Sequence, residues 1–212
     1  MDYVLDEYGN RCTYLDGKLH SYDDKPAIIY ANGDQFWYQN DKLHRDNDLP
    51  AIIYANGDQY WYQNHKRHRD NDLPAVIFTN GDQKWYQNDK LHRDNDLPAV
   101  IFANGDQEWW QNGERHRDND KPAIIYTNGD QYWYQNGERH RDTVKDGSFA
   151  LPAVIYINGD QYWYQNSKRH RVNDLPAVIH INGHAEWWID GVKIKECEDY
   201  QSRVKSARTI IN

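Results

Sequence analysis

The segment LPAIIYANGDQYWYQNHKRHRDND, residues 49–72, alternates strand-forming residues with turn-forming residues. Its PAIIY stretch at 50–54 begins with proline and is rich in β-branched residues, which favours a short strand with a marked start. The Asn-Gly step at 56–57 supplies the positive φ that a tight hairpin turn requires. QYWYQ at 59–63 is expected to return as the second strand, so the segment predicts a β-hairpin.

Two further turn signals follow in the same segment. Asn64 and the variable residue after it begin a second turn, and KRHR at 66–69 extends the chain. The polar run DND at 70–72 then favours a turn into the next proline, because Asp and Asn side chains bond their own backbone. A lone two-stranded hairpin is marginal in water, so each copy needs neighbours that cover its edges.

The segment recurs along almost the whole chain. Pro50 and Pro74 lie 24 residues apart, and the same spacing repeats except where residues 142–151 add six residues before Pro152. The recurring positions are Pro26, Pro50, Pro74, Pro98, Pro122, Pro152 and Pro176, and His20, His44, His68, His92, His116, His140 and His170. The first copy is degenerate and the last has Ile194 in place of histidine, as expected for the caps of a stacked array.

These patterns predict an all-β fold: an elongated single-sheet meander of about eight β-hairpin repeats, twisted, with degenerate terminal caps. The Asn-Gly turns favour antiparallel pairing of neighbours over the parallel stacking of a closed β-helix. We expect the hairpin array to span residues 1–194, with the insertion at 142–151, and a C-terminal capping tail to occupy residues 195–212.

Comparison of the copies indicates which face is buried. The second isoleucine of the strand, Ile53 in the quoted copy, and the tryptophan, Trp61, do not vary in the seven copies from Pro26 onward. The residue after Trp61 is always aromatic, whereas the residue before it changes freely. Because neighbouring strand residues point to opposite faces, we expect a buried ladder of Trp and Ile on one face and a half-exposed aromatic ladder on the other.

Composition and charge narrow the class of protein. The net charge of −8 argues against a nucleic-acid or membrane surface as the main partner. The two cysteines, Cys12 and Cys197, stand near opposite ends, which favours free thiols in a reducing compartment over a disulfide scaffold. No apolar stretch has membrane-spanning length and no secretory leader pattern is present. We therefore expect an intracellular protein, cytoplasmic or packaged in a virion.

The quoted segment resembles the MORN repeat. The resemblance rests on Tyr54, Asn56-Gly57-Asp58, Tyr60, Asn64 and His68, and it recurs up to Gly191. It implies an array of hairpins that pair into a long twisted sheet, with a role in scaffolding, and similar short repeats are found in giant-virus and bacterial antitoxin-like proteins. The chain departs from the MORN pattern where Arg69 replaces the glycine expected after histidine, and where YWY lacks a glycine between its aromatics.

The polar residues also allow three other interpretations: a zinc site, a calcium site and a catalytic site. Equivalent histidines two strands apart would lie roughly 9.5 Å from each other, too far to share a zinc ion, so we expect structural histidines and no metal. A single DND turn such as Asp46-Asn47-Asp48 offers about three of the 6–8 oxygens that calcium requires. Every polar group is copied at regular intervals, whereas catalysis needs unlike residues that converge once. The sequence therefore predicts no enzyme activity and no cofactor.

The aromatic ladder is the candidate binding surface, with simple packing between hairpins as the alternative. Exposed aromatics beside Arg and Lys are enriched at protein interfaces, and repeat arrays commonly bind through one continuous face. The insertion at 142–151 is either tolerated length variation or a partner-contacting loop. The candidate partner-binding residues are Tyr38, Tyr62, Tyr86, Trp110, Tyr134, Tyr164, Trp188 and Phe149.

The sequence thus predicts a non-enzymatic structural or interaction repeat protein, a scaffold or a virion-associated building block. The alternative is an antitoxin-like module that sequesters one protein partner. The expected partners are proteins, including other copies of the chain, with no nucleic acid and no membrane contact.

Overall fold

The computed structural model describes residues 3–141 and 151–197. Within these ranges the chain forms short antiparallel strands and no helix, so none of the described residues belongs to a helix capable of spanning a membrane. The predicted all-β class is confirmed. Residues 142–150 of the insertion, which include Phe149, and the last fifteen residues of the expected tail lie outside the described residues.

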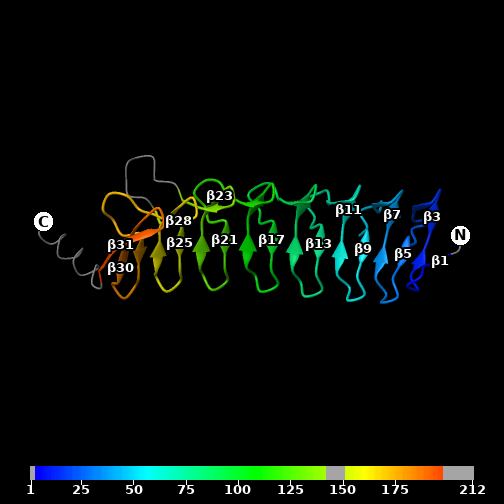
Figure 1. Ribbon diagram of the computed structural model, residues 1–212, viewed down its shortest axis with the longest axis horizontal. Coiled ribbons are helices and arrows are strands. Elements are labelled where there is room, and N and C mark those ends of the chain that lie inside the picture. Colours follow the sequence, from blue (N-terminus) through cyan, green and yellow to red (C-terminus); the bar gives the residue numbers. More distant parts are fainter. Residues whose placement is uncertain (1–2, 142–150, 198–212) are drawn as a thin grey trace, which may run out of the picture. The chain divides into compact units, whose positions relative to one another are not determined.

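The chain divides into two compact units. The first comprises Met1–Gly105 with Trp110–Gly113, and the second comprises Asp106–Trp109 with Glu114–Asn212. Both units are built from copies of one repeat, and each copy contains two hairpins. One hairpin contributes strands to an antiparallel sheet, and the other forms a two-stranded sheet of its own (Figure 1).

The first unit holds nine sheet strands that pair in chain order, each antiparallel to the next. They are β1 (Val4–Leu5), β2 (Arg11–Cys12), β5 (Ile28–Ile29), β6 (Gln35–Phe36), β9 (Ile52–Ile53), β10 (Gln59–Tyr60), β13 (Val76–Ile77), β14 (Gln83–Lys84) and β17 (Val100–Ile101). Its short-hairpin strands are β3 (Tyr14–Leu15), β4 (Lys18–Leu19), β7 (Tyr38–Gln39), β8 (Lys42–Leu43), β11 (Tyr62–Gln63), β12 (Lys66–Arg67), β15 (Tyr86–Gln87), β16 (Lys90–Leu91) and β19 (Trp110–Gln111).

The second unit repeats this plan, and its sheet strands again pair in chain order. They are β18 (Gln107–Glu108), β21 (Ile124–Ile125), β22 (Gln131–Tyr132), β25 (Val154–Ile155), β26 (Gln161–Tyr162), β29 (Val178–Ile179), β30 (Ala185–Ile189) and β31 (Val192–Cys197). Its short-hairpin strands are β20 (Glu114–Arg115), β23 (Tyr134–Gln135), β24 (Glu138–Arg139), β27 (Tyr164–Gln165) and β28 (Lys168–Arg169). The predicted meander of paired hairpins is confirmed, because neighbouring copies pair antiparallel.

The returning strand of each copy is divided at its tryptophan. In the copy at residues 49–72, β10 belongs to the sheet and β11 pairs with β12 in the short hairpin. Trp61 lies between them; its N–H donates to the Ala75 carbonyl of the next copy at 2.8 Å, and its carbonyl accepts from the His68 N–H at 3.2 Å. Each copy therefore contains two hairpins where the sequence predicted one hairpin and an extension.

The two hairpin turns of a copy use different backbone geometry. At the Asn-Gly turn Gly57 has a φ of +94° while Asn56 keeps a negative φ, and the Gly57 N–H donates to the Tyr54 carbonyl at 2.8 Å. This is a three-residue loop with glycine in the left-handed region. The tight two-residue turn with positive φ at both positions is the next one, where Asn64 and His65 have φ of +50° and +69°.

The buried side chains follow the repeat but only partly match the expected ladder. The tryptophans of the ladder are buried as predicted in the copies before the last, with Trp61 at 6% exposure, whereas Trp187 is half-buried. The invariant isoleucine is not: Ile53 is half-buried, while Ile52 before it is at 3% and Ala51 is at 0%. The expectation of a Trp–Ile core ladder is therefore wrong for isoleucine. Ile53 lies opposite the polar residue Gln59 in the β9–β10 pairing, and Gln59 shields it poorly from solvent.

Candidate functional site

A row of grooves runs along the short-hairpin side of the first unit. The largest, of about 440 Å³, is lined by residues 68–73 of one copy and by Trp85, Tyr86, His92 and Arg93 of the next. Equivalent grooves of about 230 Å³ and 150 Å³ lie one and two copies earlier. Trp, Gln, His, Arg and Asp side chains at equivalent positions line all three, and a tyrosine lines the two larger ones, so the sequence repeat is also a repeat of surface sites.

An Arg–Trp–Asp clamp, here Arg69, Trp61 and Asp48, forms a wall of the middle groove and joins two copies. The Arg69 guanidinium lies 3.8 Å from the Trp61 ring centroid and donates two hydrogen bonds of 2.8 Å to the Asp48 carboxylate. The Trp61 indole N–H donates to the Asp48 carbonyl at 3.0 Å. Planar Arg can stack and bond bidentately at once, which explains why this residue recurs.

The clamp holds its carboxylates in the charged form. The pKa of Asp48 lies below its ordinary value because Arg69 donates hydrogen bonds to it, and Arg93 lowers the pKa of Asp72 in the same way. Desolvation acts in the opposite direction at both residues but does not prevail. The clamp therefore presents fixed, paired charges to the groove.

The recurring histidines are structural links between copies. His44 Nδ1 accepts a hydrogen bond of 3.2 Å from the backbone N–H of Asn64 in the next copy. Its Nε2 lies 3.1 Å from an Asp46 carboxylate oxygen. The same acceptor role is played by His20, His68, His92, His116, His140 and His170. The contact is in each case to a turn amide of the next copy.

Exposed carboxylates edge the grooves. The side chains of Asp46, Asp70 and Asp94 are 66%, 63% and 65% exposed, each next to the histidine two residues before it. The pKa of Asp70 is lowered by a hydrogen bond from Gln63 and, after it, by the one from His68. The row thus displays negative charge at one-copy intervals.

The aromatic residues predicted to bind a partner are mostly half-buried. Those described are Tyr38, Tyr62, Tyr86, Trp110, Tyr134, Tyr164 and Trp188, all half-buried except the buried Tyr134. Burial raises the pKa of Tyr38 to about 12. Tyr134 belongs to a core cluster with Trp109 and Ile124.

Arginines of the preceding copies cover several of these rings. Arg67 lies 4.2 Å from the centroid of Tyr86, and Arg139 lies 4.8 Å from that of Tyr164. Tyr62 and Tyr86 also line the middle and largest grooves. The candidate row thus packs between copies and reaches the grooves at two of its members.

A second aromatic row lies on the sheet and was missed from the sequence. In the first unit the rings of Tyr30, Phe36, Tyr54, Tyr60 and Phe78 meet edge to face at centroid distances of 5.0–5.9 Å. The signal was present in the recurring Tyr or Phe before each Asn-Gly turn. The position before tryptophan varies between copies, but aromatic residues occupy it wherever this row continues.

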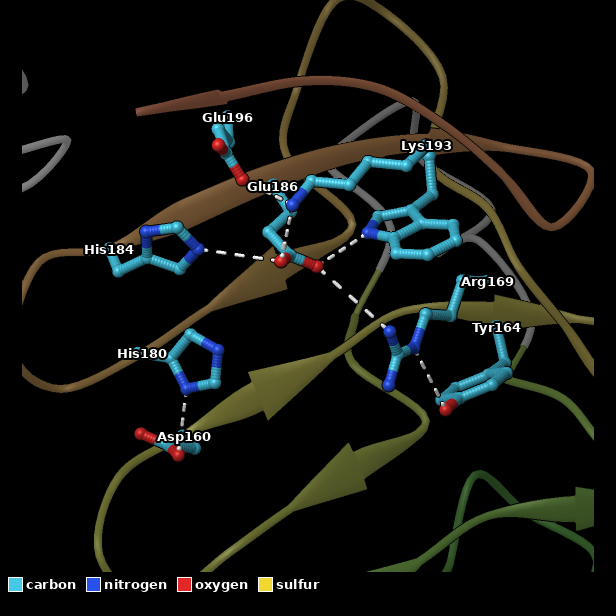
Figure 2. Close-up of polar contacts among 9 residues, drawn as sticks. Asp160, Tyr164, Arg169, His180, His184, Glu186, Lys193 and Glu196 are labelled. Atoms are coloured by element: carbon cyan, nitrogen blue, oxygen red, sulfur yellow. Dashed lines mark hydrogen bonds and ion pairs between the residues drawn. The ribbon is translucent and has the colours of Figure 1, made fainter. Parts of the chain in front are cut away.

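The last copy places a different set of side chains on the same sheet positions (Figure 2). His184 Nε2, a Glu186 oxygen and a Glu196 oxygen lie within 4.8 Å of one another. The Lys193 ammonium donates to both carboxylates, at 2.9 Å for Glu186 Oε1. The side chains come from the turn before β30 and from β30 and β31, so one hairpin positions the whole cluster.

No protein-family model matches the chain, and a search of curated proteins finds no match either. The similarity to the MORN repeat therefore rests on the sequence motif and stays a prediction. The geometry itself offers a row of polar, aromatic-walled grooves of different volume and one dissimilar cluster at the end of the repeats.

Proposed function

We propose that the chain is a non-enzymatic interaction array, a scaffold that holds protein partners along the groove row. The observation that carries the proposal is the recurrence in the first unit of one groove, lined each time by equivalent Trp, Gln, His, Arg and Asp side chains. Repetition suits multivalent binding, because a partner engaged at one groove meets the next at a raised effective concentration. Catalysis, in contrast, gains nothing from three equal copies of a site.

The grooves favour a partner segment that carries Lys or Arg. Asp46, Asp70 and Asp94 project into solvent along the row and carry negative charge at neutral pH. Tyr86 and Trp85 add aromatic surface to the largest groove, and such residues are enriched at interface hot spots. A basic, extended segment of a partner would thus meet charge and aromatic contacts once per copy.

The test is a capture experiment from native material with the full chain as bait. The variant D46N/D70N/D94N removes three groove charges while keeping an amide able to accept hydrogen bonds from Gln63 and its equivalents. The matched control E7Q/D16N/E114Q removes three exposed charges away from the grooves. We expect the groove variant to lose its partners and the control to keep them, with larger losses at higher ionic strength.

The captured material also decides between the two functional classes. A multi-protein assembly, as of a scaffold or a virion building block, supports the proposal. One small protein bound stoichiometrically supports the antitoxin-like alternative instead. Capture that is equal for the groove variant and the control would overturn the assignment of the grooves.

A further inference from the structure

We propose that the last copy binds one divalent cation of the zinc class through His184 Nε2, Glu186 Oε1 and Glu196. The three ligand atoms lie within 4.8 Å of one another. His184 Nε2 and Glu186 Oε1 are 3.4 Å apart, close to the edge of roughly 3.3 Å that a tetrahedron with metal–ligand bonds of about 2.0–2.1 Å has. Three protein ligands leave a fourth position for water.

The two carboxylates require a cation between them. Glu186 and Glu196 stand directly opposite each other in the β30–β31 register, and like charges at such a cross-strand pair destabilise a sheet. The Lys193 ammonium fills this role, since it donates to both carboxylates. Its side chain is 37% exposed, so it can turn into solvent and release the place to a metal ion.

Glu186 is already oriented as a ligand. The Trp188 indole N–H donates to its Oε2 at 2.7 Å, and an Arg169 nitrogen lies 3.9 Å from the same atom. These contacts direct Oε1 toward His184 and Lys193 (Figure 2). Such outer contacts fix ligands in metal sites.

The internal copies place other residues at these positions. The equivalents of His180, His184 and Glu186 in the copy at 49–72 are Tyr54, Asp58 and Tyr60. Asp58 Oδ1 accepts from the Thr79 backbone N–H of the following copy at 2.8 Å.

His180 brings a second imidazole beside the proposed site. Its ring centroid lies 5.5 Å from that of His184, and its Nδ1 lies 2.9 Å from an Asp160 carboxylate oxygen. A carboxylate that holds one ring nitrogen is a common support of metal-binding histidine. The recurring histidines differ, since an amide already occupies Nδ1 and, as at His44, an aspartate faces Nε2.

The experiment titrates the full-length protein with Zn²⁺ by calorimetry and with Co²⁺ by visible absorption. We expect one equivalent of each, with the intense Co²⁺ bands of a four-coordinate site. H184A and E196Q should lose binding, and W188F should weaken it about 10-fold through the freed Glu186 oxygen. K193M should tighten binding, because it removes the competing ammonium. Circular dichroism of each variant verifies the fold.

The matched control is H68A, which removes a recurring histidine and should leave the titration unchanged. The proposal is overturned if the wild-type chain binds neither ion, or if H184A and E196Q bind as tightly as wild type. Loss of binding in H68A would instead assign the metal to the recurring histidines and would also overturn it.

Discussion

An internal copy and the last copy use the same clamp with different residues. In the copy at 49–72, Trp61 is 6% exposed and is covered by Arg69, whose guanidinium binds Asp48 with two hydrogen bonds. In the last copy the half-buried Trp187 is covered by Lys195, which lies 4.6 Å from the ring and donates to Asp174 at 2.7 Å. Lys195 occupies the position equivalent to Arg69, but its compact ammonium replaces the planar guanidinium.

The difference shows where the repeat's sequence constraints come from. Trp61 donates its backbone N–H to the Ala75 carbonyl of the following copy. Trp187 instead pairs with Lys195 on the β31 strand of its own hairpin. The last copy thus contacts its own strand where an internal copy contacts the next one, and it carries Lys195, His184 and Glu186 at positions where the copy at 49–72 has Arg69, Asp58 and Tyr60.

The largest expected contrast is in the tryptophans. We expect Trp61→Ala to lower the free energy of unfolding by about 3–5 kcal/mol, because it removes a buried ring and leaves a cavity between copies. Trp187→Ala should cost about half as much, since that ring is only half-buried. Urea denaturation of the full chain, followed by circular dichroism, measures both. Equal losses would show that the difference in burial between the two rings does not set their contributions to stability.

The cations of the two clamps, Arg69 and Lys195, should differ by a smaller amount in their contribution to the free energy of unfolding. Arg69→Ala removes a stacked guanidinium, a bidentate pair and a hydrogen bond to the Pro74 carbonyl of 3.2 Å, and we expect a loss of about 2 kcal/mol. Lys195→Ala should cost under about 1 kcal/mol, as for an exposed ion pair. Arg69→Lys should recover only part of the loss, because Lys cannot bond bidentately while it stacks. Full recovery would mean that charge alone matters.

The meander and the buried tryptophans could be predicted from the sequence because they depend on local signals. Proline, Asn-Gly and the period of 24 residues fix where strands begin and turn, and these signals are independent of neighbours. The division of the strand at Trp61 was not predictable, since it depends on the hydrogen bond from Trp61 to Ala75 of another copy. The half-buried Ile53 was mispredicted for a related reason, because invariance was equated with burial.

The terminal cluster shows the limit of reasoning from the repeat. Comparison of copies directs attention to what recurs, and His184, Glu186 and Glu196 recur nowhere else as a set. Their convergence depends on the β30–β31 register, including its irregularity between Trp187 and Trp188. No spacing in the sequence reveals that register.

The clamp aspartates should give the internal copies a sensitivity to acid. The pKa of Asp48 and of Asp72 is lower in the folded chain than the ordinary 3.8, so the unfolded chain takes up protons first as the pH falls. The stability that these residues contribute is present above about pH 4 and is lost as the pH falls through their lowered values. D48N/D72N should have a lower free energy of unfolding at pH 7, and this free energy should depend less on pH between pH 5 and pH 2.

The control for this pH dependence is E7Q/D16N, which removes two exposed carboxylates outside the clamps. Its unfolding free energy should follow the wild-type curve with pH. A D48N/D72N curve as steep as wild type in the acid range would contradict the assignment of acid sensitivity to the clamps. The effect should be the smallest of the three, because both carboxylates are substantially exposed and screened by solvent.

The histidine at the end of each copy links that copy to the next through a backbone amide. His44, His68 and His92 accept the Asn64, Asn88 and Asn112 amides at Nδ1, which requires the proton to sit on Nε2, facing aspartate. The direct test is the imidazole nitrogen spectrum of the full-length protein at pH 8. We predict the Nε2–H tautomer at all three residues. An Nδ1–H tautomer, or the averaged signals of free exchange between the two, would contradict it.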